Sequence, residues 1–268
     1  MILRLDKYLA DTGFGTRSTV KQMIRKGQVQ IDGAVVKSSD VKLDTGKSVV
    51  TVNGKTVSYE EFEYYMLNKP AGVISASTDE REKTVVDLIS DKKRRDLFPV
   101  GRLDRDTVGL LLITNDGALS QKLLAPGKHV DKVYLVRVTG ELTEEDVRAF
   151  EDGMDIGDEK LTKPAKMVIK KIMPDEVDEA AGDEYDADRT SNDDHDEAER
   201  LDSDGVITEA EVTLTEGRFH QIKRMFEARG HEVVYLKRLS MGSLKLDESL
   251  DEGEYRKLTD EELSSLRG

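Results

Sequence analysis

One carboxylate with an arginine on either side is the feature of this sequence best suited to chemistry. Asp104 lies between Arg102 and Arg105 in the run GRLDRDTVGLLLITNDG, residues 101–117. An opposite charge within a few ångströms favours the ionised form of a carboxyl group, and a buried strand directly after it would hold its loop rigidly. The pattern therefore predicts a nucleophilic or basic carboxylate, although the spacing alone also fits a surface ion pair in a turn.

The elements around Asp104 must position it, and their patterns indicate an α+β domain. Apolar and alternating runs predict strands at 64–69, 110–113, 131–140, 161–173 and 207–217. Helices are expected at 84–89, 118–124, 143–153 and 220–230, and Thr143 is the expected start of the third. Because strands outnumber helices and many are joined by hairpins, we expect an extended, mostly antiparallel sheet with flanking helices.

The first 58 residues read as a small basic module of their own. Helical spacing predicts one helix ending near Gly13 and a second that Thr16 caps and Gly27 ends. A hairpin with its turn at Asp32-Gly33 should follow, then a strand at 49–52. Residues 59–63 look like a short linker, so we expect domains at 1–58 and 59–268.

Composition excludes several classes of protein. The 268 residues contain no cysteine, which rules out a disulfide framework, a thiol nucleophile and a cysteine-ligated metal. The four histidines lack metal-ligand spacing, and no apolar run is long enough to span a membrane. The first residues lack the apolar core of a signal peptide. We expect a cytoplasmic protein without contact to membranes.

The net charge of −14 misleads if it is averaged over the chain. Residues 175–204 hold fifteen acidic residues against two arginines, whereas residues 1–58 carry a net charge of +5. The acidic segment has few aromatic residues and cannot bury enough apolar surface to order itself, so we expect a disordered loop inserted between two strands. A role in mimicking RNA or recruiting a basic partner is the alternative for this segment.

The run at 101–117 resembles the catalytic motif of the pseudouridine synthases, in particular the branch that modifies bacterial ribosomal RNA. The resemblance implies that Asp104 is the essential residue and that Tyr134 stacks on the target base. It implies that Lys223 pairs with the catalytic aspartate. It also implies that RNA is bound by Arg102, by Lys69 in the Asn-Lys-Pro segment and by Gln221 beside Lys223. Without the resemblance, Tyr134 reads as a half-buried strand residue and Lys223 as an exposed helix lysine.

The N-terminal module resembles the S4 RNA-binding domain. Here the resemblance implies phosphate contacts from Arg17, Lys21 and Arg25, which provide affinity with little sequence information. Without it, basic residues on amphipathic helices would be only a solvated face.

Within the family, the segments LTKPA, KLLAPGKHVDKVYLV and the C-terminal end favour the small-subunit branch. The resemblance then implies an isomerase that converts one uridine of 16S rRNA to pseudouridine as a monomer, without a cofactor or metal. Its partner would be rRNA, in a partly assembled small subunit or naked. The alternatives are the same reaction on 23S rRNA and a noncatalytic RNA-binding assembly factor. A glycosidase would need a second acid about 5 to 10 Å from the first, and none is evident.

Overall fold

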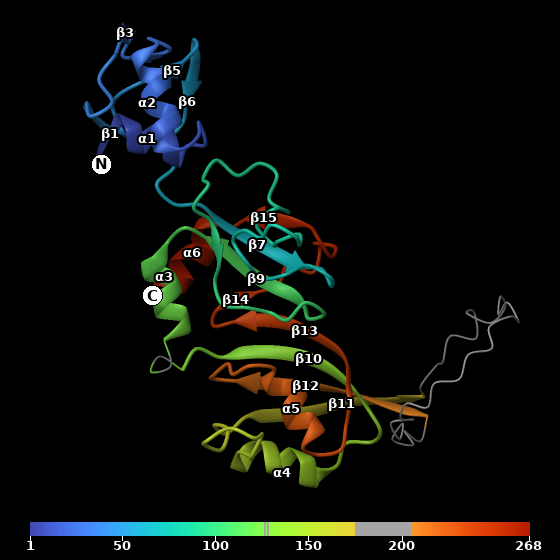
Figure 1. Cartoon of the computed structure of the whole chain (residues 1–268). Helices are drawn as coiled ribbons and strands as arrows, with labels where there is room; N and C mark the ends of the chain where they lie inside the picture. The colour runs from blue at the N-terminus through green and yellow to red at the C-terminus, as the bar shows by residue number, and fades with distance from the viewer. Residues whose placement is uncertain (126, 128, 175–204) are drawn as a thin grey trace, which may run out of the picture. The chain divides into compact units, whose positions relative to one another are not determined.

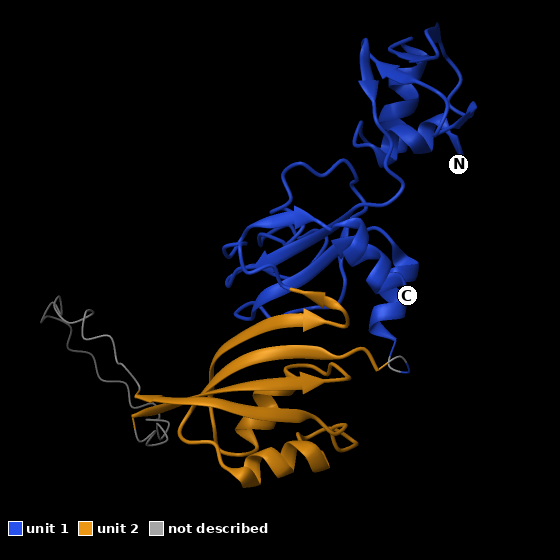
Figure 2. Cartoon of the chain, turned by 180° about the vertical axis from the view of Figure 1, so that it is seen from behind, with its two compact units in different colours: residues 1–128, 246–268 blue, residues 129–245 orange. Residues whose placement is uncertain are grey.

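The computed structural model of the chain describes residues 1–125, 127, 129–174 and 205–268. These form two compact units, the first comprising residues 1–128 and 246–268 and the second residues 129–245 (Figures 1 and 2). The acidic segment 175–204, expected to be disordered, lies outside the described residues. The boundaries of the two units lie after residues 128 and 245. They do not test the expected domain boundary at residue 58, which stays a prediction.

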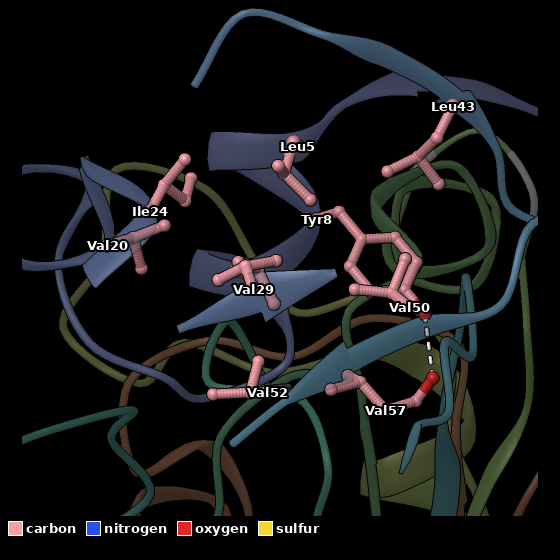
Figure 3. Close-up of a cluster of buried hydrophobic side chains, with 10 residues drawn as sticks. Leu5, Tyr8, Val20, Ile24, Val29, Leu43, Val50, Val52 and Val57 are labelled. Carbon is pink, nitrogen blue, oxygen red and sulfur yellow. Dashed lines mark hydrogen bonds between the residues drawn. The ribbon is translucent and has the colours of Figure 1, made fainter. Parts of the chain in front are cut away.

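The N-terminal module of unit 1 has its own hydrophobic core. Tyr8 lies in the middle of that core, and its hydroxyl donates to the carbonyl of Val57 at 2.8 Å (Figure 3). Two helices and a four-stranded antiparallel sheet of order β3-β2-β5-β6 enclose the core. Their bounds are α1 Leu5–Asp11, α2 Arg17–Arg25, β2 Val29–Ile31, β3 Ala34–Val35, β5 Val50–Val52 and β6 Lys55–Val57.

The local signals expected in this module are confirmed. The Thr16 hydroxyl accepts the amide of Thr19 at the start of α2, which satisfies one of the free donors of the first turn. Asp32 and Gly33 have φ of 50° and 84°, the left-handed pair that a tight hairpin turn requires. A further two-stranded ladder joins β1 (Ile2–Arg4) to β4 (Lys42–Asp44).

The remainder of unit 1 is built around the buried strand β9 (Val108–Thr114), in which every residue is buried. It pairs with β7 (Tyr64–Lys69) and with β8 (Phe98–Pro99), and β7 pairs in turn with β15 (Tyr255–Lys257). Asp116 caps α3 (Gly117–Leu124) by accepting the amide of Leu119. The C-terminal helix α6 (Asp260–Arg267) belongs to the same unit.

The expectation of a helix at 84–89 is wrong. Thr84 instead forms a parallel bridge to Ile74, and the segment after it turns. The Asp87 carboxylate accepts both the amide and the hydroxyl of Thr84, so its side chain stabilises a turn in place of a helix. Val85, Val86 and Ile89 are nevertheless buried, which explains why their spacing suggested a helix.

Unit 2 is an antiparallel sheet of order β11-β12-β10-β13, with α4 and α5 on one side of its strands (Figure 2). The Phe150 ring of α4 lies 4.8 Å from the Phe226 ring of α5, which ties the two helices together. The bounds are β10 Lys132–Thr139, α4 Glu144–Asp152, β11 Lys166–Pro174, β12 Val206–Leu214, α5 Gln221–Glu227, β13 Val233–Met241 and β14 Leu244–Lys245.

The described strand pairs are antiparallel in both units, which confirms the α+β class with a mostly antiparallel sheet. Thr143 begins α4 as expected, and it does so through a capping box in which the Asp146 carboxylate accepts the Thr143 amide. Within the described ranges, no helix combines the length and the apolar character that crossing a membrane requires.

Candidate active site

Asp104 lies in the loop of residues 100–107, between β8 and β9 of unit 1. Its side chain is partly exposed and interacts with other groups of the protein. The loop leaves the sheet at Gly101, whose φ of 80° lies in the left-handed region. A Cβ atom there would lie 3.1 Å from the Leu124 side chain, so both conformation and space favour glycine.

The segment of residues 69–75 holds the Asp104 loop from the other side. The Ser75 hydroxyl donates to the Leu103 carbonyl at 2.7 Å and accepts the Leu103 amide at 3.1 Å. The Gly72 amide donates to the Arg105 carbonyl at 2.8 Å. Both neighbours of Asp104 in the chain are therefore fixed through their backbones, so the position of the carboxylate is set by contacts that its side chain does not supply.

Lys69 completes this attachment from the interior. It is the last residue of β7, it is fully buried, and its Nζ donates to the carbonyls of Pro70, Arg105 and Thr107 at 3.0, 3.2 and 2.9 Å. Burial lowers the pKa of Lys69 to about 8, and the charges of Asp106 and Asp104 oppose that shift. The ammonium thus binds the loop that carries Asp104, and direct RNA binding by Lys69 stays a prediction.

The two arginines beside Asp104 have different surroundings. Arg105 donates through Nε to the Gly72 carbonyl at 3.3 Å and forms an ion pair with Glu82 at 3.4 Å, so its guanidinium is directed to the facing segment. Arg102 is exposed, and its positive charge is accessible to a phosphate. Binding of RNA by Arg102 stays a prediction.

Tyr134 is a buried residue of β10 in unit 2. In the ladders it faces Val212 of β12 and Arg238 of β13, and the register of the β13 ladder shifts between Val133 and Tyr134. Such irregularities redirect side chains and are frequent next to active sites. Arg238, which sequence reasoning missed, is buried at this position and engaged by other groups, so a fixed positive charge lies beside the candidate base-stacking tyrosine.

Lys223 is the third residue of α5, the helix that packs against β13. Ile222, Met225 and Phe226 are buried as expected, and Lys223 is partly exposed with interactions of its own. Tyr134 and Lys223 thus both lie on elements next to β13, in the unit that does not contain Asp104. The pairing of Lys223 with Asp104 stays a prediction.

Gln221, the first residue of α5, is buried, and its side-chain amide forms hydrogen bonds within the protein. Its Oε1 accepts the amide of Arg218 at 2.9 Å, and its Nε2 donates to Glu216 at 2.9 Å. These contacts fix the entry into α5. A contact of Gln221 with RNA stays a prediction, and the observed role of the side chain is to shape the loop before Lys223.

The basic residues expected to bind phosphates share one face of α2. Arg17, Lys21 and Arg25 are four residues apart, which places them on one side of a helix, and Arg17 and Arg25 are exposed. The adjoining face of α2 carries Val20 and Ile24, which are buried in the module's core. The described residues contain no cluster of three or more histidine or acidic side chains that could hold a metal ion.

Comparisons with known proteins place these features in a family. A family model described as RNA pseudouridylate synthase matches residues 63–228, and an S4 domain model matches residues 3–49. An uncharacterized RNA pseudouridine synthase of Bacillus subtilis (strain 168) is 44% identical over 98% of each chain. A crystal structure of a pseudouridylate synthase has a TM-score of 0.60 and 34% identity, covering 98% of this chain and 99% of that one.

Relatives named for each ribosomal subunit are similar to nearly the same degree. Ribosomal large subunit pseudouridine synthase B of Bacillus subtilis (strain 168) is 37% identical over 98% of this chain and 95% of its own. Ribosomal small subunit pseudouridine synthase A of Haemophilus influenzae is 35% identical over 98% of this chain and 99% of its own. Overall identity therefore does not separate the two targets.

Proposed function

The chain belongs to the RNA pseudouridylate synthase family, and on that premise we propose that it converts one uridine of 16S rRNA to pseudouridine, with Asp104 as the essential carboxylate. The observation that carries the proposal is the loop of residues 100–107. Contacts from Lys69, Gly72 and Ser75 reach its backbone on both sides of Asp104. A carboxylate held in this way is suited to a reaction that depends on placement.

The reaction is an isomerisation in which no electrons are gained or lost. The C1′–N1 bond of uridine breaks, the base turns and C1′ bonds to C5; a proton leaves C5 and N1 gains one. Three roles are open to Asp104: attack on C1′, attack on C6 of the base, or removal of the C2′ proton of the ribose. Deuterium at C2′ should produce a large, primary isotope effect on the chemical step only in the third case, so single-turnover rates on labelled RNA separate it from the other two.

The other site residues are assigned around the base and the phosphates. Tyr134 stacks on the target uridine after the base has flipped out of the RNA helix. Flipping the base costs a few kcal/mol, which contacts with the RNA must offset. Lys223 pairs with Asp104 and orients its carboxylate. Arg102, exposed beside Asp104, holds the flipped nucleotide through its phosphate.

The S4 domain supplies affinity for structured RNA. Arg17, Lys21 and Arg25 contact phosphates along one face of α2, which positions the enzyme without reading sequence. The substrate is rRNA, naked or in a partly assembled subunit, and the protein acts in the cytoplasm as a monomer. Its net charge does not oppose this, because the acidic excess is concentrated at 175–204.

The choice of 16S over 23S rRNA is supported by three sequence segments, LTKPA (161–165), KLLAPGKHVDKVYLV (122–136) and the end of the chain from Gly242. The 23S reaction is the second candidate, because a relative named for the large subunit is similar at 37% identity. Mapping the pseudouridines in rRNA from cells with and without the gene tests the proposal. We expect one 16S site to disappear on deletion; loss of a 23S site instead would select the second candidate.

A further inference from the structure

An exposed phenylalanine of unit 2 has no role in the core. Phe219 lies between β12 and α5 of unit 2, and 76% of its surface is exposed, more than any other large hydrophobic side chain in the described ranges. A large apolar ring kept in water contributes nothing to folding through burial. A single exposed apolar side chain is common on protein surfaces, so what distinguishes Phe219 is how its backbone and its ring are held.

The backbone around Phe219 is held firmly. Arg224 donates through Nε to the Phe219 carbonyl at 2.9 Å and forms an ion pair with Asp158 at 2.8 Å. On the preceding side, Arg218 donates to the carbonyls of residues 160–161, each at 2.7 Å. The ring of Phe219 is therefore presented by a fixed loop, and its exposure is a built feature of this segment.

The next residue adds backbone strain and a second ring. His220 has φ of 47° and ψ of 35°, a left-handed conformation that few residues other than glycine adopt. Its ring stacks on that of Phe219 with centroids 3.8 Å apart and planes 16° from parallel. Strain of this kind persists where the surrounding structure enforces it, and it is concentrated at binding and catalytic sites.

We propose that Phe219, supported from behind by the His220 ring, is a stacking platform for an unpaired RNA base next to the target uridine. This inference rests on the proposed function. Lys223 follows Phe219 by four residues at the start of α5, so a base stacked on Phe219 belongs to a nucleotide close to the one at the site. Every nucleobase has an aromatic face, so the platform binds by stacking and tolerates different bases.

A fluorescence experiment tests the contact directly. The chain contains no tryptophan, so Phe219→Trp introduces a single reporter. Val234→Trp is the matched control, because Val234 is an exposed hydrophobic residue of the same unit. With an rRNA fragment that contains an unpaired segment, we expect quenching of the Phe219→Trp emission and no change in the Val234→Trp emission. Emission at position 219 that responds to ribosomal protein but not to RNA would overturn the proposal.

Kinetics give the second test. Phe219→Ala should raise the KM for the RNA about ten- to hundredfold, whereas Phe219→Tyr should stay within about threefold because it keeps the ring. The rate at saturating RNA should change little in either variant, which a general disruption of the loop would not produce. Equal KM values for Phe219→Ala and the wild type would refute the platform alone. A wild-type enzyme that forms no pseudouridine in any rRNA would refute the proposed function beneath it.

Discussion

Replacing Lys69 with methionine tests whether the placement of Asp104 depends on the buried ammonium. Methionine fills a similar volume but withdraws three hydrogen bonds, two of which reach the loop of residues 100–107. The Arg105 carbonyl keeps the bond from the Gly72 amide. If the carbonyls of Pro70 and Thr107 are left unsatisfied, the loss is about 1–3 kcal/mol for each.

The same substitution also removes the unfavourable free energy of burying the charged ammonium of Lys69. Burial lowers the pKa of Lys69 from 10.5 to about 8, so the charged form carries a cost of roughly 3 kcal/mol in the folded state. The two effects largely cancel in the free energy of unfolding, which should fall by no more than about 3 kcal/mol. The loop itself loses its fixed position, and a displacement of about 1 Å at a reacting group costs about a hundredfold in rate.

The assay is single-turnover pseudouridine formation with enzyme in excess over RNA, accompanied by urea unfolding. Lys92→Met is the matched control, because Lys92 also donates to two backbone carbonyls of unit 1, those of Val86 and Ile89, away from the Asp104 loop. We expect a loss of about a hundredfold for Lys69→Met and less than about threefold for Lys92→Met. A folded Lys69→Met enzyme with the wild-type rate would refute this reasoning, as would an equal loss in both variants.

Three further predictions concern Gly101, the basic face of α2 and the pH dependence of Lys69. Gly101→Ala should lower the free energy of unfolding by about 1–2 kcal/mol more than Gly54→Ala does, as measured by urea denaturation. Both glycines have positive φ, but only at Gly101 would the added Cβ contact Leu124. Changing Arg17, Lys21 and Arg25 to glutamine should reduce the slope of log affinity against log salt by about 2–3, whereas the same change at the exposed Lys42, Lys47 and Lys55 should leave the slope nearly unaltered. Between about pH 8 and pH 10.5, Lys69 binds fewer protons in the folded chain than in the unfolded chain, so the free energy of unfolding should rise with pH over this range. Lys69→Met should abolish that rise. An unchanged pH dependence in this variant would contradict the lowered pKa of the buried Lys69.

Much of the fold could be predicted from local signals. The Thr16 cap, the Asp32-Gly33 turn and the capping box at Thr143 act over three or four residues, so their types alone determine the outcome. The strand β9 reads directly from its unbroken apolar run. The helix α6 was not predicted, although Thr259 followed by Glu262 forms a capping box that could have indicated it.

The surroundings of the candidate site depend on contacts that are distant in sequence. The sequence shows Lys69 only as a lysine before a proline at the end of a strand, and its buried position depends on carbonyls 36 and 38 residues away. Arg238 follows another basic residue in a strand, and only its alignment with Tyr134 in the ladder reveals its place. The segment at 84–89 has helical spacing, yet the hydrogen bonds between Asp87 and Thr84 favour a turn.

The central claim is that Asp104 is the essential carboxylate of a uridine isomerase, and two variants expressed in cells that lack the gene test it most directly. Asp104→Asn removes the negative charge and keeps the shape, and Asp106→Asn makes the same change two residues away in the same loop. Mapping of rRNA pseudouridines should show the missing site restored by the wild type and by Asp106→Asn, and absent with Asp104→Asn. Restoration of the site by Asp104→Asn would contradict the account.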